Sequence, residues 1–499
     1  MDPGFALYIA DQDKDEKYEI YGFDPQTGNT NKLNSDLLDC SGAITNLSWT
    51  PDLTRVIYSG SQDGSVAVEL YSVMIDGSNR IKLNTALSEG GNISHFIPSP
   101  DNQHVAYIAD NDTDGVDEVY SVRLDGSGHV KLNGSMIAGG KVTKIAWAPD
   151  GSRLVYEADQ NIDGVVELFS VRPDGSGRTR LNGALVSTGS VVDWQWAADG
   201  LRIVYFANQD IANVMELYSV LPNGSGLAKL NGNLGTSGDV VEGSWAVSPT
   251  GSHVLYLADQ DTNQIFELYS AAIDGSTRVK VNGPLPSGAQ IKSWKWAPDG
   301  SRVSYVADQN TPGEFGLYSV APDGKGRIAL NLPLAAGGKF QAVQWAADSS
   351  RVFYSAEQET LGVYELYSAS SDGSDFVKLS GAFTSGGGIP TADAWEPSPD
   401  GRYVAYRADQ ITDGNFELFV AQADGAKAAT KVSGTLASGG DVTALQWSAD
   451  GARVYFLADK LNDNTVELFG VEADGSATRK INGELTAGGN VVNFVWAKR

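Results

Sequence analysis

The chain has 499 residues, of which 41% are hydrophobic, and its 36 basic and 62 acidic residues give a net charge of −26. This charge makes nucleic acid and anionic membranes poor partners, because both repel an acidic surface. The single cysteine, Cys40, excludes an intrachain disulfide. No apolar run approaches the roughly 20 residues of a membrane-spanning helix, so no membrane insertion is expected.

From its N-terminus the chain repeats one pattern, in which an aromatic residue is followed by an Ala-Asp-Gln-like stretch, a turn and Glu-Leu-Tyr or a variant of it. Successive copies begin 49 to 52 residues apart. The ten copies start at Tyr8, Tyr58, Tyr107, Tyr156, Tyr205, Tyr256, Tyr305, Tyr354, Tyr406 and Phe456. A tryptophan recurs in phase with them, and Phe96 takes its place once. A period of about 50 residues is typical of propeller blades.

The unit that starts at Val142 shows the predicted elements. Alternating apolar and polar residues predict strands at 142–148, 152–159, 166–172 and 178–182. Pro-Asp-Gly turns separate the first strand from the second and the third from the fourth. An acidic loop separates the second strand from the third. Four antiparallel strands in each unit favour a β-propeller.

The segment Ser398–Gly425 carries a Ser-Pro-Asp-Gly turn, an apolar strand that ends in Ala-Asp, a Glu-Leu-Phe strand and an Asp-Gly turn. This order resembles the WD-repeat-like blades of TolB-like bacterial β-propellers. The resemblance extends along the whole chain. It implies an all-β fold and an exported protein, periplasmic or extracellular, but it specifies no activity. The N-terminus has no basic and apolar signal region, so we expect this chain to lack the signal peptide.

The first unit lacks its inner strand, whereas residues 490–499 form an inner strand with nothing after it. We therefore predict that 490–499 supply the inner strand of the first blade. Such a closure removes exposed strand edges. It predicts one domain, 1–499, that is a single-ring β-propeller of ten four-stranded blades. Two smaller packed rings are the alternative.

The acidic loops have the spacing of calcium ligands, because alternating carboxylates around a glycine-assisted turn place several oxygens about one ion. Positions one, three, five and nine are all acidic in two copies. These candidate metal ligands are Asp11, Asp13, Asp15 and Glu19 in the first copy, and Asp110, Asp112, Asp114 and Glu118 in the third. The spacing also resembles the blade loops of integrin-type propellers. Two departures count against calcium: position nine is Glu, and the loop joins the second and third strands.

A scaffolding role is the alternative for these carboxylates. Positions one and nine are acidic in nearly every copy, whereas positions three and five vary, and Gly316 replaces the glutamate once. Carboxylates at strand ends accept hydrogen bonds from turn N–H groups. The repeated Trp and Tyr residues are predicted to pack blade against blade. Two extra tryptophans, Trp194 and Trp294, either add packing or line a sugar-binding surface.

The sequence gives little support for catalysis. It has four histidines, of which His104 and His253 occupy a slot that holds Arg in other copies, and it has no Gly-x-Ser-x-Gly motif and no phosphate-binding loop. We expect a monomeric, non-enzymatic binding scaffold whose acidic loop face takes a protein or a glycan, with Ca²⁺ ordering some loops as a further hypothesis. The alternatives are a carbohydrate-active lyase or glycosidase that uses loop carboxylates, and a structural subunit of a surface assembly.

Overall fold

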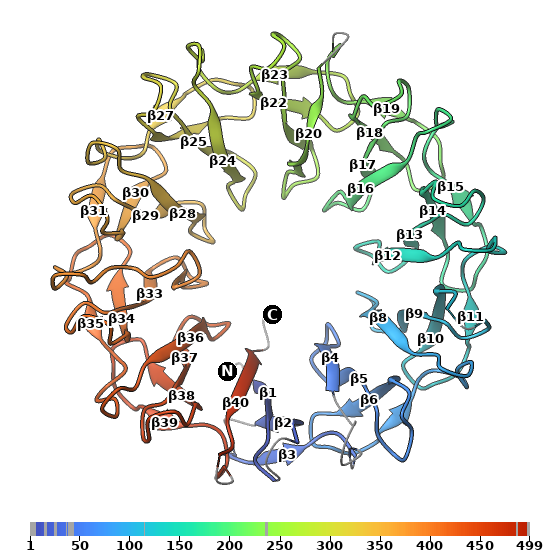
Figure 1. Cartoon of the computed structure of the whole chain (residues 1–499), viewed down its shortest axis with the longest axis horizontal. Coiled ribbons are helices and arrows are strands. Elements are labelled where there is room, and N and C mark those ends of the chain that lie inside the picture. The colour runs from blue at the N-terminus through green and yellow to red at the C-terminus, as the bar shows by residue number, and fades with distance from the viewer. Residues whose placement is uncertain are drawn as a thin grey trace. The chain divides into compact units, whose positions relative to one another are not determined.

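The computed structural model describes residues 6–13, 17–23, 27–35, 37, 44–113, 115–234, 238–485 and 488–496. These residues form ten four-stranded antiparallel sheets, and most of their strands are labelled in Figure 1. None of the described residues belongs to a helix that is long and apolar enough to cross a membrane.

Each sheet has the same strand order, and its strands occupy the same positions in the repeat. The first strands are β40 (Val491–Trp496), β4 (Ile44–Trp49), β8 (Ile93–Pro98), β12 (Val142–Trp147), β16 (Val191–Trp196), β20 (Val240–Val247), β24 (Ile291–Trp296), β28 (Phe340–Trp345), β32 (Trp395–Pro397) and β36 (Val442–Trp447). The second strands are β1 (Ala6–Ala10), β5 (Arg55–Gly60), β9 (His104–Ala109), β13 (Leu154–Ala158), β17 (Ile203–Ala207), β21 (His253–Ala258), β25 (Val303–Ala307), β29 (Arg351–Ala356), β33 (Tyr403–Ala408) and β37 (Arg453–Ala458).

The third strands open on the ninth loop position, and the fourth strands are short. The third strands are β2 (Glu19–Phe23), β6 (Glu69–Met74), β10 (Glu118–Arg123), β14 (Glu167–Val171), β18 (Glu216–Val220), β22 (Glu267–Ala272), β26 (Gly316–Val320), β30 (Glu365–Ser370), β34 (Glu417–Gln422) and β38 (Glu467–Glu472). The fourth strands are β3 (Thr30–Lys32), β7 (Ile81–Lys82), β11 (Val130–Lys131), β15 (Thr179–Arg180), β19 (Ala228–Lys229), β23 (Arg278–Lys280), β27 (Ile328–Ala329), β31 (Phe376–Lys378), β35 (Thr430–Lys431) and β39 (Arg479–Lys480).

The predicted fold class is confirmed: the chain is an all-β propeller of ten four-stranded blades. It divides into two compact units, one made of residues 1–31 and 281–499 and the other of residues 32–280. The descriptions below therefore stay within one unit at a time.

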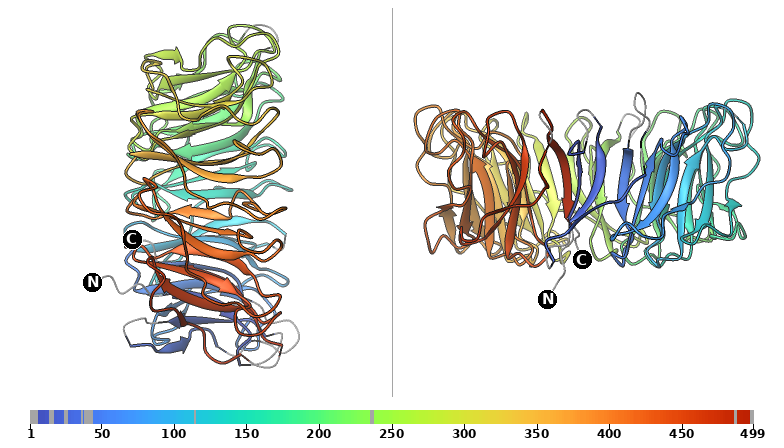
Figure 2. Two further views of the ribbon diagram at one scale, coloured as in Figure 1. Left: turned by 90° about the vertical axis from the view of Figure 1, so that its left-hand side faces the viewer. Right: turned by 90° about the horizontal axis from the view of Figure 1, so that it is seen from below.

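The C-terminal strand completes the N-terminal blade, as predicted. β40 pairs antiparallel with β1, and Tyr8 lies opposite Phe494 in the register. The two strands lie side by side in Figure 2. Val491 and Phe494 are buried in a core cluster with Tyr8, Tyr21 and residues of β37 and β38. This pairing gives β1 a partner on the edge that would otherwise be exposed.

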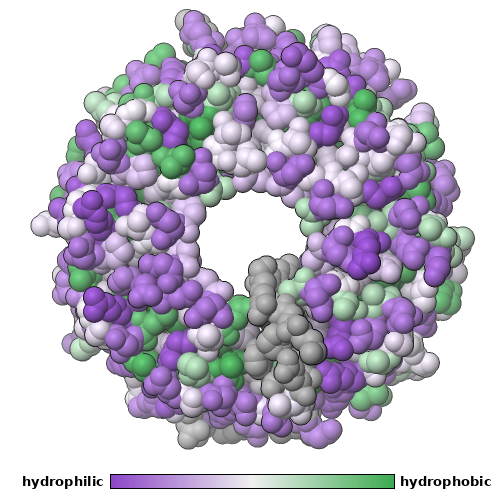
Figure 3. Space-filling view, turned by 180° about the vertical axis from the view of Figure 1, so that it is seen from behind, coloured by the Kyte–Doolittle hydropathy of each residue, from purple (hydrophilic) through white to green (hydrophobic). Residues whose placement is uncertain are grey.

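The second and third strands form the buried middle of each blade. Leu154, Val155 and Tyr156 of β13 have no exposed surface, and the Tyr156 ring stacks on Phe169 of β14 at 5.2 Å between ring centroids. The fourth strand is the blade's outer edge; β15 contributes only two ladder pairs and ends in Arg180. Short, charged edge strands disfavour pairing with other molecules. Figure 3 shows mostly hydrophilic residues on the visible surface, with small hydrophobic groups among them.

The repeated tryptophan packs blade against blade, as predicted. Trp147 Nε1 donates to the Ile97 carbonyl oxygen of the preceding blade at 3.1 Å, and Trp447 Nε1 donates to the Glu396 carbonyl oxygen at 2.9 Å. The extra Trp194 is 2% exposed, and its indole N–H donates to Glu157 at 2.8 Å. Packing therefore accounts for Trp194, whose indole N–H also has a partner.

Candidate functional site

The carboxylate at position one ties the acidic loop to the linker that enters the same blade. In the β12–β15 blade, Asp159 accepts hydrogen bonds from the Lys141 N–H at 2.7 Å and from the Gly164 N–H at 3.2 Å. The linker bond recurs at Asp11, Asp110, Asn208, Asp259, Asp308, Glu357, Asp409 and Asp459. Loop and linker thus lie on the same side of each blade, and position one has the scaffolding role that the sequence favours.

The glutamate at position nine is the buried end of an ion pair. Glu118 is 3% exposed, and it accepts hydrogen bonds from the Tyr120 hydroxyl at 3.0 Å and from Asn133 Nδ2 at 3.3 Å. Lys131 Nζ lies 2.5 Å from its carboxylate. Pairs of this kind join Glu69 to Lys82, Glu118 to Lys131, Glu167 to Arg180, Glu216 to Lys229, Glu267 to Lys280, Glu365 to Lys378, Glu417 to Lys431 and Glu467 to Lys480.

The buried carboxylate shifts its neighbours' titration. Burial and the charge of Glu118 raise the pKa of Tyr120. Burial alone would lower the pKa of Lys131, but its hydrogen bonds to Glu118 and Asp112 outweigh burial and raise it. Both side chains therefore keep their protons at neutral pH.

In the third copy of the loop, the predicted metal ligands have other partners. Asp110 binds the Asn92 and Gly115 N–H groups, and Asp112 lies 3.0 Å from Lys131 Nζ. The ammonium group of Lys131 thus occupies the cation position between Asp112 and Glu118. Asp114 lies outside the described residues.

In the first copy, Asp11 accepts a hydrogen bond from the Asn490 N–H at 2.7 Å and Glu19 accepts one from the Tyr21 hydroxyl at 3.2 Å. The charge of Asp13 contributes to the raised pKa of Tyr21, after burial and Glu19. Asp15 lies outside the described residues. Within the described part of the chain, no three His, Cys, Asp or Glu side chains are grouped so that they could hold a metal ion. The calcium site stays a prediction.

If calcium binds these loops, the melting temperature in excess Ca²⁺ is expected to exceed the melting temperature in a chelator. A ligand that binds only the folded state stabilises that state, by about 2.7 kcal/mol when its concentration is one hundred times Kd. Scanning calorimetry measures the difference, with Mg²⁺ as the control cation. Equal melting temperatures in Ca²⁺ and in chelator would show that these loops do not bind calcium.

A glutamine at position two joins neighbouring blades, and we did not predict this role from the sequence. Gln209 Oε1 accepts hydrogen bonds from the Tyr205 hydroxyl at 2.6 Å and from the Gly183 N–H at 2.8 Å, and Gly183 begins the linker that leads from the preceding blade. The linker N–H bond recurs at Gln62, Gln160, Gln260, Gln309 and Gln410. Lys460 replaces the glutamine in one blade and donates to the carbonyl oxygens of Ser433 and Thr435. The recurrence of Gln directly after position one was the available signal.

Replacing Gln209 by Ala is expected to lower the free energy of unfolding by about 1–3 kcal/mol, because the buried Tyr205 hydroxyl and the partly buried Gly183 N–H lose their acceptor. Gln209 is 5% exposed. Urea unfolding measures the change. The exposed Gln103 of a Pro-Asp-type turn provides the control, and Gln103→Ala is expected to change stability by less than about 0.5 kcal/mol. Equal effects of the two variants would show that the interblade bond contributes little.

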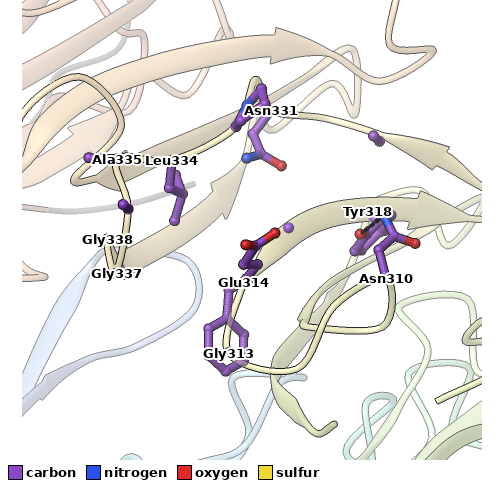
Figure 4. Close-up of a pocket in the computed structure, with 14 residues that line it drawn as sticks. Asn310, Gly313, Glu314, Tyr318, Asn331, Leu334, Ala335, Gly337 and Gly338 are labelled. Atoms are coloured by element: carbon purple, nitrogen blue, oxygen red, sulfur yellow. Dashed lines mark hydrogen bonds between the residues drawn. The ribbon is translucent and has the colours of Figure 1, made fainter. Parts of the chain in front are cut away.

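One blade departs from this scheme and holds a pocket. In the β24–β27 blade, Gly316 stands at position nine and Ala329 stands where the other blades have Lys or Arg. A pocket of about 480 Å³ lies there, between the acidic loop and the linker of residues 331–338. Figure 4 shows Glu314 on the loop facing Leu334 across the opening, with Tyr318 beside Asn310.

The pocket's polar groups are held in place by the blade. Asn310 Nδ2 donates to the Tyr318 hydroxyl at 3.0 Å, and Asn331 Oδ1 accepts the Leu317 N–H at 2.7 Å. A Cβ atom on Gly316 would lie 2.7 Å from the Tyr318 hydroxyl, so the tyrosine occupies the space that glutamate fills elsewhere. The sequence showed Gly316 as an exception, but its proximity to Ala329 became visible only in the sheet, where β26 pairs with β27 and Ala329 lies opposite Tyr318.

The histidines form no catalytic arrangement in the part of the chain that the structure describes. Burial lowers the pKa of His95, His104, His129 and His253, so each is neutral at pH 7. His253 Nδ1 hydrogen-bonds to the adjacent Ser252 hydroxyl at 2.9 Å, and the His104 ring packs on Trp147.

Comparisons with known proteins found similar solved structures and one family model. No curated protein matches this chain. A solved structure of a eukaryotic initiation factor is similar, with a TM-score of 0.50 and 10% identity over 99% of this chain and 98% of that chain. The structure of dipeptidyl peptidase 4 of Porphyromonas gingivalis has a TM-score of 0.49 and 11% identity, and the match covers 88% of this chain and 59% of that chain. The structure of TolB of Acinetobacter baumannii has a TM-score of 0.30 and 17% identity, and the match covers 55% of this chain and 62% of that chain. Residues 391–499 match the family model of the lipoprotein LpqB β-propeller domain, and the segment 398–425 that resembles bacterial propeller blades lies within this match.

Proposed function

We propose that the protein is a non-enzymatic binding scaffold and that its acidic loop face binds a protein partner with basic and apolar side chains. The supporting observation is where large hydrophobic residues are exposed. Within the described part of the chain, eight of them lie on the loops between second and third strands, which are otherwise acidic. They are Tyr18, Val66, Ile162, Ile211, Phe266, Leu361, Ile411 and Leu461.

Single exposed hydrophobic residues are common on protein surfaces, but their recurrence on one kind of loop favours an interaction face. Three consecutive blades of the compact unit that contains residues 281–499 illustrate the pattern. Leu361, Ile411 and Leu461 are 61%, 53% and 56% exposed. Exposed acidic residues stand in the same loops, among them Asp413 and Asp463. Apolar tips beside carboxylates complement a partner that presents apolar and basic side chains.

Further support comes from charge and composition. A net charge of −26 speeds encounter with basic partners and disfavours nucleic acid. Catalytic residues are expected to differ from the repeated pattern, whereas the loop carboxylates recur from blade to blade and hold the loops in place. The similarity of residues 391–499 to a lipoprotein domain supports a location in the bacterial cell envelope. We further propose that the protein acts as a monomer.

These exposed hydrophobic residues are called the loop tips. The test replaces three of them together, as Leu361→Ser, Ile411→Ser and Leu461→Ser. The control carries Leu201→Ser and Leu227→Ser, which are exposed on turns that connect other strands. Both proteins serve as baits for cross-linked envelope extracts, followed by mass spectrometry. We expect the wild type and the control to capture the same partner, the tip variant to lose it, and added salt to weaken capture. Capture of nothing specific, or equal capture by all three, would contradict the proposal.

A further inference from the structure

The β24–β27 blade lacks an ionic triad that other blades contain. Among the contacts of the residues that the structure describes, four blades show a lysine of the fourth strand in contact with the acidic residue at position three and the glutamate at position nine. These triads are Asp112–Lys131–Glu118, Asp210–Lys229–Glu216, Asp261–Lys280–Glu267 and Glu359–Lys378–Glu365. In the β24–β27 blade the three positions hold Asn310, Ala329 and Gly316, so all three charges are absent together.

This joint replacement turns a filled position into an open one. The lysine side chain that would cross the space is reduced to Ala329, which lines the pocket of about 480 Å³, whereas Tyr318 takes the space beside Gly316 that glutamate fills in other blades. Tyr318 is 7% exposed and forms its inner wall. The volume falls within the range of about 300–1,000 Å³ that is typical of small-ligand pockets.

The lining residues define the ligand's chemistry. None of the described residues that line the pocket is Lys, Arg or His, which disfavours phosphate, carboxylate and sulfate groups. The carboxylates that bind ammonium groups in other blades are missing, and Glu314 at the rim is exposed. Asn310, Asn331 and Tyr318 carry neutral hydrogen-bonding groups, whereas Phe315 and Leu334 supply apolar surface.

Neutral hydroxyl-rich molecules with apolar C–H faces match this combination. We propose that the pocket between residues 310–318 and 329–338 binds a neutral saccharide unit. Its hydroxyls would exchange hydrogen bonds with the two amides and the tyrosine, and its C–H face would pack on Phe315 and Leu334. This site goes beyond the proposed protein-binding face, because it uses none of the exposed loop tips.

The test titrates the protein with neutral disaccharides, namely maltose, cellobiose, lactose and N,N′-diacetylchitobiose, by calorimetry and ligand-observed NMR. One variant restores the triad with Asn310→Asp, Gly316→Glu and Ala329→Lys; since Glu at 316 displaces Tyr318, a second variant, Leu334→Trp, fills the pocket from the linker. Lys325→Ala, on a turn outside the pocket, is the control. Melting temperatures establish that each variant is folded.

We expect at least one neutral disaccharide to bind the wild type and Lys325→Ala equally, and each folded pocket variant to bind it at least tenfold more weakly. The loop-tip variant with Ser at 361, 411 and 461 is expected to bind the saccharide like the wild type, which separates this site from the protein-binding face. Absence of binding to the wild type, unchanged binding to both pocket variants, or equal binding of digalacturonate would overturn the assignment.

Discussion

Above pH 10 the free energy of unfolding is expected to fall steeply, because buried tyrosines ionise in the unfolded chain but not in the folded one. Burial raises the pKa of Tyr58, Tyr305 and Tyr455 from 10.0 to about 12, and none of the three is more than 1% exposed. Their pKa is higher in the folded state, so their contribution is complete below pH 10 and disappears as the pH rises toward 12. In that window, the contribution of each tyrosine to the free energy of unfolding falls by about 1.4 kcal/mol per pH unit.

Together these three tyrosines remove about 4 kcal/mol per pH unit, which is large beside the usual stability of about 5–15 kcal/mol. Urea unfolding at a series of pH values measures the slope. In Tyr305→Phe one titrating phenol is gone, so the slope is expected to be smaller by about 1.4 kcal/mol per pH unit. Tyrosinate absorbance should appear together with the loss of the β-sheet circular dichroism signal. Ionisation of these tyrosines while the sheets are intact would refute the mechanism.

The sequence predicts the fold well because blade geometry depends on local patterns. Apolar alternation and Pro-Asp-Gly turns place the second strand at 152–159 and the third at 166–172, where the structure has Leu154–Ala158 and Glu167–Val171. The fourth strand is shorter than its predicted 178–182, since only Thr179 and Arg180 pair with the neighbouring strand. An edge strand ends where its ladder ends, and side-chain alternation does not record that point.

The site was predicted less completely, because its contacts join separate parts of the repeat. Position one accepts backbone N–H groups, which follows from its place at a strand end. The cation that pairs with position nine lies 13 residues further on in β11, as Lys131 does for Glu118. Gln209 bonds to Gly183, at the start of the linker that leads from the preceding blade into its own blade. Such partners become apparent only when strands and blades are placed side by side.

Removing residues 491–499 is expected to be the most destabilising truncation, because it takes away the strand that completes the first blade. The deletion opens the core around Phe494, which is 9% exposed, and Val491, which is 1% exposed. Loss of a buried phenylalanine alone costs about 3–5 kcal/mol. It also exposes the edge of β1, which favours aggregation. Urea unfolding and light scattering measure both effects, and a chain that ends at Trp496 is the matched control.

A circular permutant separates the strand's presence from its place in the chain. Trp496 lies opposite Ala6 in the register, as Trp147 lies opposite Leu154, and six residues join the latter pair. Fusing residue 499 to residue 1 provides eight residues for the same turn, with new ends between Ala138 and Gly139, which are both exposed. Because β40 and β1 then form one continuous hairpin, the urea concentration at the midpoint of unfolding is expected to be at least as high for the permutant as for the intact chain. If the permutant were no more stable than the truncated protein, the β1–β40 pairing would not be what completes the first blade.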